Sequence, residues 1–215
     1  MPSVQHRNPN LMKPPRQARS AATVGAIFEA TIQVLLAEGA SRLTTTRVAE
    51  RAGVSVGTLY QYFPHKQALL HALLQRHLWQ IGDAVEAACA RLHGAPTEEI
   101  AAGLATAYLD AKTLHVDLSR AFCLASGEVD GTQFAAEMSA RIRAALRALL
   151  ASCSDGAFAD LDTVAFVLQQ ALLGTVRGVL ESEGGPSPAA LALLYEQLPI
   201  LCSSYLLQAH RKAAA

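Results

Sequence analysis

The feature of the sequence that most constrains its fold is the segment LTTTRVAERAGVSVGTLYQYF, residues 43–63, which predicts two short helices joined by a tight turn. The threonines at positions 44–46 offer an N-cap for a first helix that ends near Ala52, and Ser55 offers the N-cap of the second. Gly53 lies between them, where the chain must turn through a conformation that other residues resist. Two helices with a glycine at the turn are therefore expected here.

The residues around this glycine determine how the two helices can pack. Ala49 is small enough to let the helices approach each other. Val48, Val54 and Leu59 can fill the wedge between them. This spacing of small, turning and apolar residues is that of a helix-turn-helix unit, in which the second helix enters the major groove of DNA. The glycine alone is a weak signal, but the complete set is specific.

The second helix carries side chains suited to reading DNA. Short or polar residues near its N-terminus leave base edges accessible. Four such residues stand there: Ser55, Val56, Gly57 and Thr58. The far end carries groups that can reach phosphate oxygens: Tyr60, Tyr62, His65 and Lys66. Leu59 and Phe63 are expected to face the other way and to seal a small helical core.

The N-terminal third of the chain is basic. Residues 1–70 hold eight Lys and Arg residues against three acidic residues, whereas the whole chain has 18 of each kind. This part therefore has an excess of five positive charges, and the remainder has an equal excess of negative charge. Such a split indicates that residues 1–70 bind a polyanion and that the remainder of the chain does not. Accidental clustering of charges is the alternative.

The longer block LTTTRVAERAGVSVGTLYQYFPHKQALL, residues 43–70, closely resembles the DNA-binding head of the TetR (tetracycline-repressor) family of transcriptional regulators. The resemblance covers residues 20–75, and its T-L-Y-x-Y-F-x-x-K core is highly specific. It implies an all-α homodimer with an N-terminal three-helix helix-turn-helix domain and a C-terminal helical bundle. The bundle would bind a small effector and dimerise through its last two helices. The implied function is that of a repressor released from a near-palindromic double-stranded DNA operator by the effector.

The resemblance also implies roles for residues of the head. Thr45, Thr46 and Arg47 would contact phosphates. Tyr62 and Lys66 would clamp the DNA backbone. Base edges would be read by Ser55, Val56, Gly57, Thr58 and Gln61. Gly57 stands where several members of the family carry Pro or Ala, which leaves the base preference open.

The pattern along the chain predicts three parts. Residues 1–18, rich in proline and basic residues, predict a flexible basic arm. Residues 19–66 predict the helix-turn-helix DNA-binding domain, and residues 67–215 predict the effector-binding and dimerisation domain. Beyond the head, capping and breaking residues predict helices over 64–92, from Thr97 onward, and over 117–127, 131–152, 158–182 and 188–210.

The helix expected over 158–182 offers two faces. One narrow stripe of small side chains permits close helix packing, and we interpret it as part of a dimer interface: Val167, Ala171, Gly174 and Gly178. Packing of these residues within one subunit is the alternative. The opposite face is apolar with a few polar groups, as an effector pocket requires. Candidate pocket residues are Phe166, Gln169, Leu173 and Arg177, with Trp79, Tyr108, His115 and Cys123, for which ordinary core packing is the alternative.

Other function classes find little support in the sequence. The four cysteines lie far apart and form no Cys-x-x-Cys pair, so neither a metal site nor a cofactor is predicted. We expect no secretory signal, and the longest uncharged apolar stretches fall short of the ~18 residues of a membrane span. A cytoplasmic location without a membrane partner is therefore expected. The rival class is a helical-bundle enzyme or carrier acting on an apolar small molecule. Its usual catalytic motifs are absent from the sequence, which favours a non-enzyme.

Overall fold

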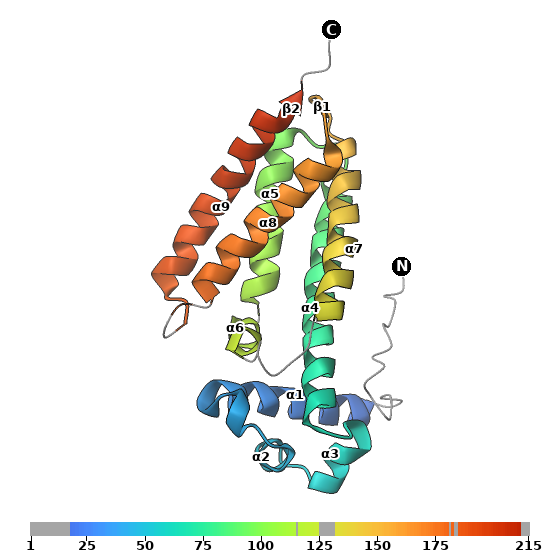
Figure 1. Cartoon of the computed structure of the whole chain (residues 1–215), viewed down its shortest axis with the longest axis vertical. Helices are drawn as coiled ribbons and strands as arrows, with labels where there is room; N and C mark the ends of the chain where they lie inside the picture. Colours follow the sequence, from blue (N-terminus) through green and yellow to red (C-terminus); the bar gives the residue numbers. More distant parts are fainter. Residues whose placement is uncertain (1–17, 115, 125–131, 181, 183–184, 212–215) are drawn as a thin grey trace. The chain divides into compact units, whose positions relative to one another are not determined.

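The computed structural model describes residues 18–114, 116–124, 132–180, 182 and 185–211 (Figure 1). Nearly all of these residues are helical, which confirms the predicted all-α fold. The predicted arm lies outside the described residues except for Ala18, where the first helix begins. In chain order the elements are α1 (Ala18–Glu38), the 3-10 helix η1 (Ala40–Arg42), α2 (Thr45–Arg51), α3 (Val56–Tyr62), α4 (Lys66–Arg91), α5 (Thr97–Thr113), α6 (Val116–Leu124), α7 (Thr132–Ala151), β1 (Ala157–Phe158), α8 (Leu161–Leu180), α9 (Pro188–Ala209) and β2 (His210–Arg211).

The described residues fall into two compact units. The head unit holds the described part of Met1–His77 and of Arg120–Gln133. The body unit holds the described part of Leu78–Ser119 and of Phe134–Ala215. Both α4 and α6 contribute residues to each unit. The boundary between predicted domains at residues 66 and 67 stays a prediction.

The head unit has a core formed by the long helix α1 and the short helices α2 and α3. Helix α1 packs on α2, and α2 packs on α3. Ile27, Val48 and Leu59 contribute fully buried side chains to this core. Phe63 directly follows α3 and is also fully buried, with its ring centroid 5.5 Å from that of Phe28. The expectation that Leu59 and Phe63 face the core is confirmed.

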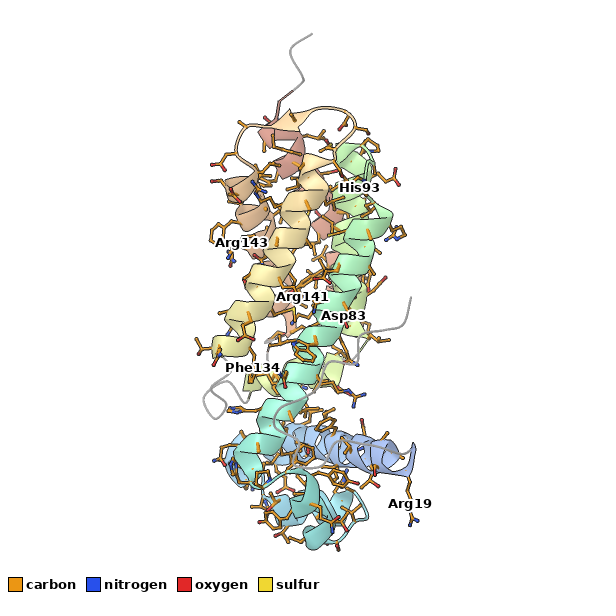
Figure 2. All side chains as sticks on the ribbon, turned by 90° about the vertical axis from the view of Figure 1, so that its right-hand side faces the viewer. Arg19, Asp83, His93, Phe134, Arg141 and Arg143 are labelled. Carbon is orange, nitrogen blue, oxygen red and sulfur yellow. The ribbon has the colours of Figure 1, made fainter. Side chains whose placement is uncertain are left out.

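The body unit is a helical bundle. Helix α5 packs mainly against α9 and also against α8, and α8 packs against α9. Arg141 of α7 fastens that helix to α4 (Figure 2). Its Nε donates to Glu86 Oε1 at 2.5 Å, and its Nη2 donates to Asp83 Oδ1 at 2.6 Å. The side of the bundle formed by α4 and α7 is thus tied by ion pairs as well as by apolar packing.

Two helices begin later than the sequence pattern predicts, and in both a side chain caps the observed start. The helix expected from residue 64 begins at Lys66, since His65 Nδ1 accepts a hydrogen bond from the Ala68 amide at 3.1 Å. The helix expected from residue 158 begins at Leu161. There, Asp160 Oδ1 accepts from the Thr163 amide at 3.0 Å. Ala157 and Phe158 form strand β1, which pairs antiparallel with β2, and they are therefore not part of the helix.

A polar cluster joins the start of α5 to the loop after α7. Asp155 Oδ1 accepts hydrogen bonds from the Thr97 amide at 3.0 Å and from the Thr97 hydroxyl at 2.7 Å. The Cys153 thiol donates to the same oxygen at 2.8 Å. These bonds, with the thiol contributing most, lower the pKa of Asp155 from 3.8 to about 2. The charged form of Asp155 therefore stabilises the folded body.

This cluster predicts a pH dependence of stability. The folded-state pKa of Asp155 lies below its ordinary value, so its contribution is present above pH 3.8 and is lost as the pH falls toward 2. Asp155→Asn should reduce the free energy of unfolding at neutral pH, and the difference from the parent protein should shrink across that window. Urea unfolding at a series of pH values measures it. A difference that is constant with pH would contradict the assignment.

Three helices are long and apolar enough to cross a membrane by length and composition: Arg19–Glu38, α8 and α9. Each of these helices contains charged residues, so none of them is an uncharged apolar stretch of the length of a membrane span. In α9, only 22% of the most apolar window is buried, against 39% in the other two helices. Helix α9 therefore leaves a larger share of its most apolar window unburied than the other two helices do.

Candidate nucleic-acid interface and body cavity

Helices α2 and α3 are each started by a capping hydroxyl and are separated by a glycine turn. Thr44 Oγ1 accepts a hydrogen bond from the Arg47 amide at 3.3 Å, and Ser55 Oγ accepts from the Thr58 amide at 3.0 Å. Each bond satisfies an amide that the first turn of a helix would leave without a partner. Gly53 has φ 67°, a conformation that favours glycine. The chain therefore forms the predicted pair of short helices.

The N-terminal part of α3 presents a mainly polar surface of short side chains. Ser55 and Gly57 are exposed there, and Val56 and Thr58 are partly exposed. Gln61, near the other end of the helix, is also exposed. Ser55 Oγ and Thr58 Oγ1 lie 2.8 Å apart and share a hydrogen bond. A Cβ built at Gly57 would meet the Ser55 hydroxyl oxygen at 3.8 Å, an ordinary contact distance. Base edges of a DNA groove can approach such a surface closely.

Tyr60 links the exposed surfaces of α2 and α3. Its side chain is 44% exposed, and its hydroxyl lies 3.1 Å from Thr45 Oγ1. Thr46, next along α2, is exposed. Neighbouring hydroxyls of this kind can donate to phosphate oxygens. The structure thus brings three predicted phosphate-binding residues to neighbouring positions that are exposed or partly exposed.

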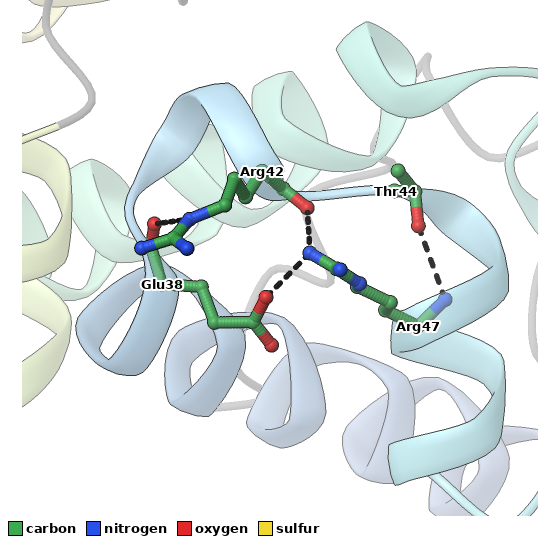
Figure 3. Close-up of polar contacts among 4 residues, drawn as sticks. All are labelled: Glu38, Arg42, Thr44 and Arg47. Atoms are coloured by element: carbon green, nitrogen blue, oxygen red, sulfur yellow. Dashed lines mark hydrogen bonds and ion pairs between the residues drawn. The ribbon is translucent and has the colours of Figure 1, made fainter.

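Arg47 is exposed, and its guanidinium already interacts with Glu38 and Arg42 (Figure 3). Its Nη1 donates to the Arg42 carbonyl oxygen at 2.9 Å and forms an ion pair with Glu38 Oε2. Because both side chains are substantially exposed, this pair adds little stability, on the order of 0 to 1 kcal/mol. The guanidinium can therefore exchange Glu38 for a phosphate at small cost.

The other residues predicted at the far end of α3 have structural partners. Lys66 Nζ donates to the Ala40 carbonyl oxygen at 3.3 Å. His65 is exposed, and its Nδ1 serves as the cap of α4. Tyr62 is only 7% exposed, with its ring centroid 6.4 Å from that of Phe63. Most of the Tyr62 side chain thus belongs to the head core, and its part in a backbone clamp stays a prediction.

The phosphate role of Arg47 makes a measurable prediction. Arg47→Ala should weaken DNA binding uniformly across sequences and reduce the magnitude of the slope of log affinity against log salt by about 0.9 for each bound subunit, the value for one phosphate contact on duplex DNA. Fluorescence anisotropy at several salt concentrations measures this slope. Arg91→Ala, at an exposed position in the last turn of α4, is the matched control. An unchanged slope for the Arg47 variant would refute the contact.

A cavity of about 170 Å³ lies in the body unit among α4, α5, α7 and α8. Tyr108, Gln169 and Leu173 line it, as the sequence analysis predicted for an effector pocket. Three other predicted pocket residues are not among the lining residues that the structure describes. Trp79 packs against the body core, and Phe166 and Arg177 are exposed. His115 and the side chain of Cys123 lie outside the described part of the chain.

The predicted dimer stripe lies on an open face of α8. Val167, Gly174 and Gly178 are exposed, and Ala171 is partly exposed. A Cβ built at either glycine meets no heavy atom of the described chain within 4 Å. Helix α9 adds exposed apolar side chains, among them Leu193, Ile200 and Leu207. Packing within one subunit therefore does not explain why positions 174 and 178 are glycine.

Several residues of these sites were missed by sequence reasoning. Glu38 and Arg42 hold Arg47 but come from a different helix and turn, so no local pattern connects them. Lys112 lines the cavity four residues after Tyr108 on α5, a spacing that places both on one helical face and was available in the sequence. Ser139 reaches the cavity from α7, and only the tertiary fold shows this.

Comparison with known families matches both parts of the chain. The family described as "Bacterial regulatory proteins, tetR family" matches residues 27–73. The family described as "Tetracyclin repressor-like, C-terminal domain" matches residues 96–206. The first match contains α2 and α3, and the second contains α5, α7 and α8.

Individual relatives are similar over about a third of the chain. The HTH-type transcriptional regulator BetI 1 of Chromohalobacter salexigens is 37% identical over 76 residues, which cover 35% of this chain and 38% of that protein. The HTH-type transcriptional repressor KstR of Mycolicibacterium smegmatis is 39% identical over 74 residues, covering 34% of this chain and 36% of that protein. These matches thus span little more than a third of either relative.

The fold as a whole has counterparts among solved structures. A TetR-family transcriptional regulator from Mesorhizobium loti MAFF303099 superposes with a TM-score of 0.67 at 18% identity, covering 91% of this chain and 100% of that one. At this identity the likeness concerns the fold alone. Together with the two family matches, it shows that the chain belongs to the TetR family of bacterial regulatory proteins.

Proposed function

We propose that this protein is a transcriptional repressor that binds a near-palindromic DNA operator as a homodimer and is released by a small-molecule effector. The observation that carries the proposal is the exposed surface of α2 and α3. It combines short polar side chains at the start of α3 with the hydroxyls of Thr45 and Tyr60 and the guanidinium of Arg47. Family membership supports the same function, and it supports a regulator over an enzyme.

The homodimer in this proposal is formed by α8 and α9. Gly174 and Gly178 leave space in which a second helix can approach closely, and Val167 extends the same stripe. The exposed apolar residues of α9 would be covered by the partner copy. Association therefore removes from water the apolar surface that otherwise makes these helices resemble membrane spans. A soluble cytoplasmic dimer, in the compartment of its DNA operator, is the corresponding location.

Release by an effector follows from thermodynamic linkage. The two α3 helices of a dimer must occupy successive major grooves, about 34–36 Å apart. An effector bound in the body cavity can favour a conformation with a different separation. It must then weaken DNA binding by the same factor by which DNA weakens effector binding.

The proposal is tested by selecting bound sequences from a random duplex pool with the purified protein. We expect enrichment of an inverted repeat. Gly57→Glu is the matched control, because the added Cβ fits beside Ser55 while the carboxylate repels DNA. It should stay folded by circular dichroism and enrich no sequence. A folded parent protein without enrichment, or equal enrichment by the Glu variant, would refute the proposed interface.

A further inference from the structure

We propose that the body cavity binds a small, mainly apolar molecule that carries a hydroxyl group and no positive charge, such as a phenol or a short alcohol. The inference rests on the function proposed above, because it names the chemical class of the effector. Its support comes from three properties of the cavity: its size, the charges of its lining and an unpaired oxygen of Gln169.

The size and the aliphatic lining set the bulk of the ligand. The cavity has a volume of about 170 Å³. An apolar protein cavity of about 150 Å³ holds one benzene molecule. Much of the wall consists of aliphatic side chains, including Ile81, Leu104, Ile142 and Leu172. A ligand with about six to eight non-hydrogen atoms and a hydrocarbon body therefore fits the available space.

The charges of the lining exclude a cation. Lys112 is among the lining residues, and the described lining contains no Asp or Glu. An ammonium ligand would bring a second positive charge into an apolar enclosure without a carboxylate to compensate it. A neutral or anionic molecule avoids this cost.

Gln169 identifies the polar group that the ligand must carry. Its Nε2 donates to the Ser139 carbonyl oxygen at 2.8 Å and lies 3.2 Å from Ser139 Oγ. A backbone carbonyl only accepts, so the atom facing it must be the amide nitrogen and the other atom must be the oxygen. This Oε1 is buried, and no hydrogen-bond donor reaches it in the described structure.

An unpaired buried acceptor requires a donor. Gln169 lines the cavity and is only 3% exposed. In this proposal its Oε1 lies at the cavity wall, where a donor on the ligand can reach it. A hydroxyl on the ligand supplies that donor, whereas an ether, a ketone or a pure hydrocarbon does not. The site should therefore select for the hydroxyl more strongly than for the shape of the hydrocarbon.

The test compares phenol with toluene, which has nearly the same shape but no donor, by titration calorimetry on the full chain without DNA. A cavity that is only apolar would prefer toluene, because toluene is the more hydrophobic molecule. We expect phenol to bind about tenfold more tightly, corresponding to one satisfied hydrogen bond. Benzylamine, as a cation, should not compete. Tighter binding of toluene, binding of neither probe, or effective competition by benzylamine would overturn the proposal.

A pair of variants locates the preference. Gln169→Met removes the amide at nearly constant size and should reverse the preference in favour of toluene. Gln80→Met, at an exposed position of α4, should retain the preference for phenol. Persistence of the phenol preference in a folded Gln169 variant would overturn the role of this oxygen. If that variant fails to fold, the comparison of phenol with toluene on the parent protein still decides the proposal.

These titrations contain no DNA and therefore separate two kinds of failure. Phenol binding with the expected preference but without effect on operator affinity would leave the ligand class in place and refute the effector role of the cavity. Operator binding that is normal, in a protein that binds neither probe, would refute the ligand class and leave the regulator function in place.

Discussion

Replacing Phe63 with alanine is expected to lower the free energy of unfolding of the head unit by about 3–5 kcal/mol. Phe63 is fully buried and packs on Phe28, so the substitution loses apolar burial and leaves a cavity in the head core. A loss of this size is comparable to the stability of many small domains. DNA binding should therefore disappear together with the folded head.

Urea unfolding followed by circular dichroism measures this loss. Phe166→Ala is the matched control, because Phe166 is 47% exposed on α8 and its truncation leaves no buried cavity. We expect the control to change the free energy of unfolding by about 0.5 kcal/mol or less per subunit. A Phe63 variant as stable as the control would show that the head core does not depend on this ring.

Gly178→Arg is expected to convert the protein to a monomer. It should reduce operator affinity by about a hundredfold or more, because a monomer binds DNA through one α3 helix and not two. Within one chain the new side chain has open space, since a Cβ at position 178 meets no described heavy atom within 4 Å. In the proposed dimer, two arginines would be forced into a close helix contact. The variant should therefore fold normally and fail to associate.

Sedimentation equilibrium measures the mass in solution, and fluorescence anisotropy measures the binding to the selected operator. Ala148→Arg provides the same change in size and charge at an exposed position of α7. It should leave both the mass and the affinity unchanged. A Gly178 variant that remains dimeric would place the interface elsewhere on the molecule.

The parts of the fold that local chemistry determines were predictable from the sequence. Gly53 was expected to turn the chain between two short helices in a conformation that other residues resist, and it has φ 67° between α2 and α3. The hydroxyls of Thr44 and Ser55 were recognised as possible caps because a cap acts on an amide only three residues away. Features of this kind depend on short stretches of chain, and a single sequence contains them completely.

Features that depend on distant residues were not predictable. The start of α8 is shifted because β1 pairs with β2, which lies more than fifty residues further along the chain. The ion pair between Arg47 and Glu38 requires α1 and α2 to be folded against each other. Likewise, Gln169 could be named as a pocket residue from its place on α8, but its bond to Ser139 could not.

The room for a side chain at Gly57 has a consequence for how such a protein can change over generations. The residue lies on the exposed surface of α3, yet a side chain there would displace nothing in the head core. If α3 reads DNA as proposed, a mutation at this position alters which operators are bound while the core retains its stability. Duplicated copies of the gene could acquire new regulatory targets through this one position, with no compensating change elsewhere in the fold.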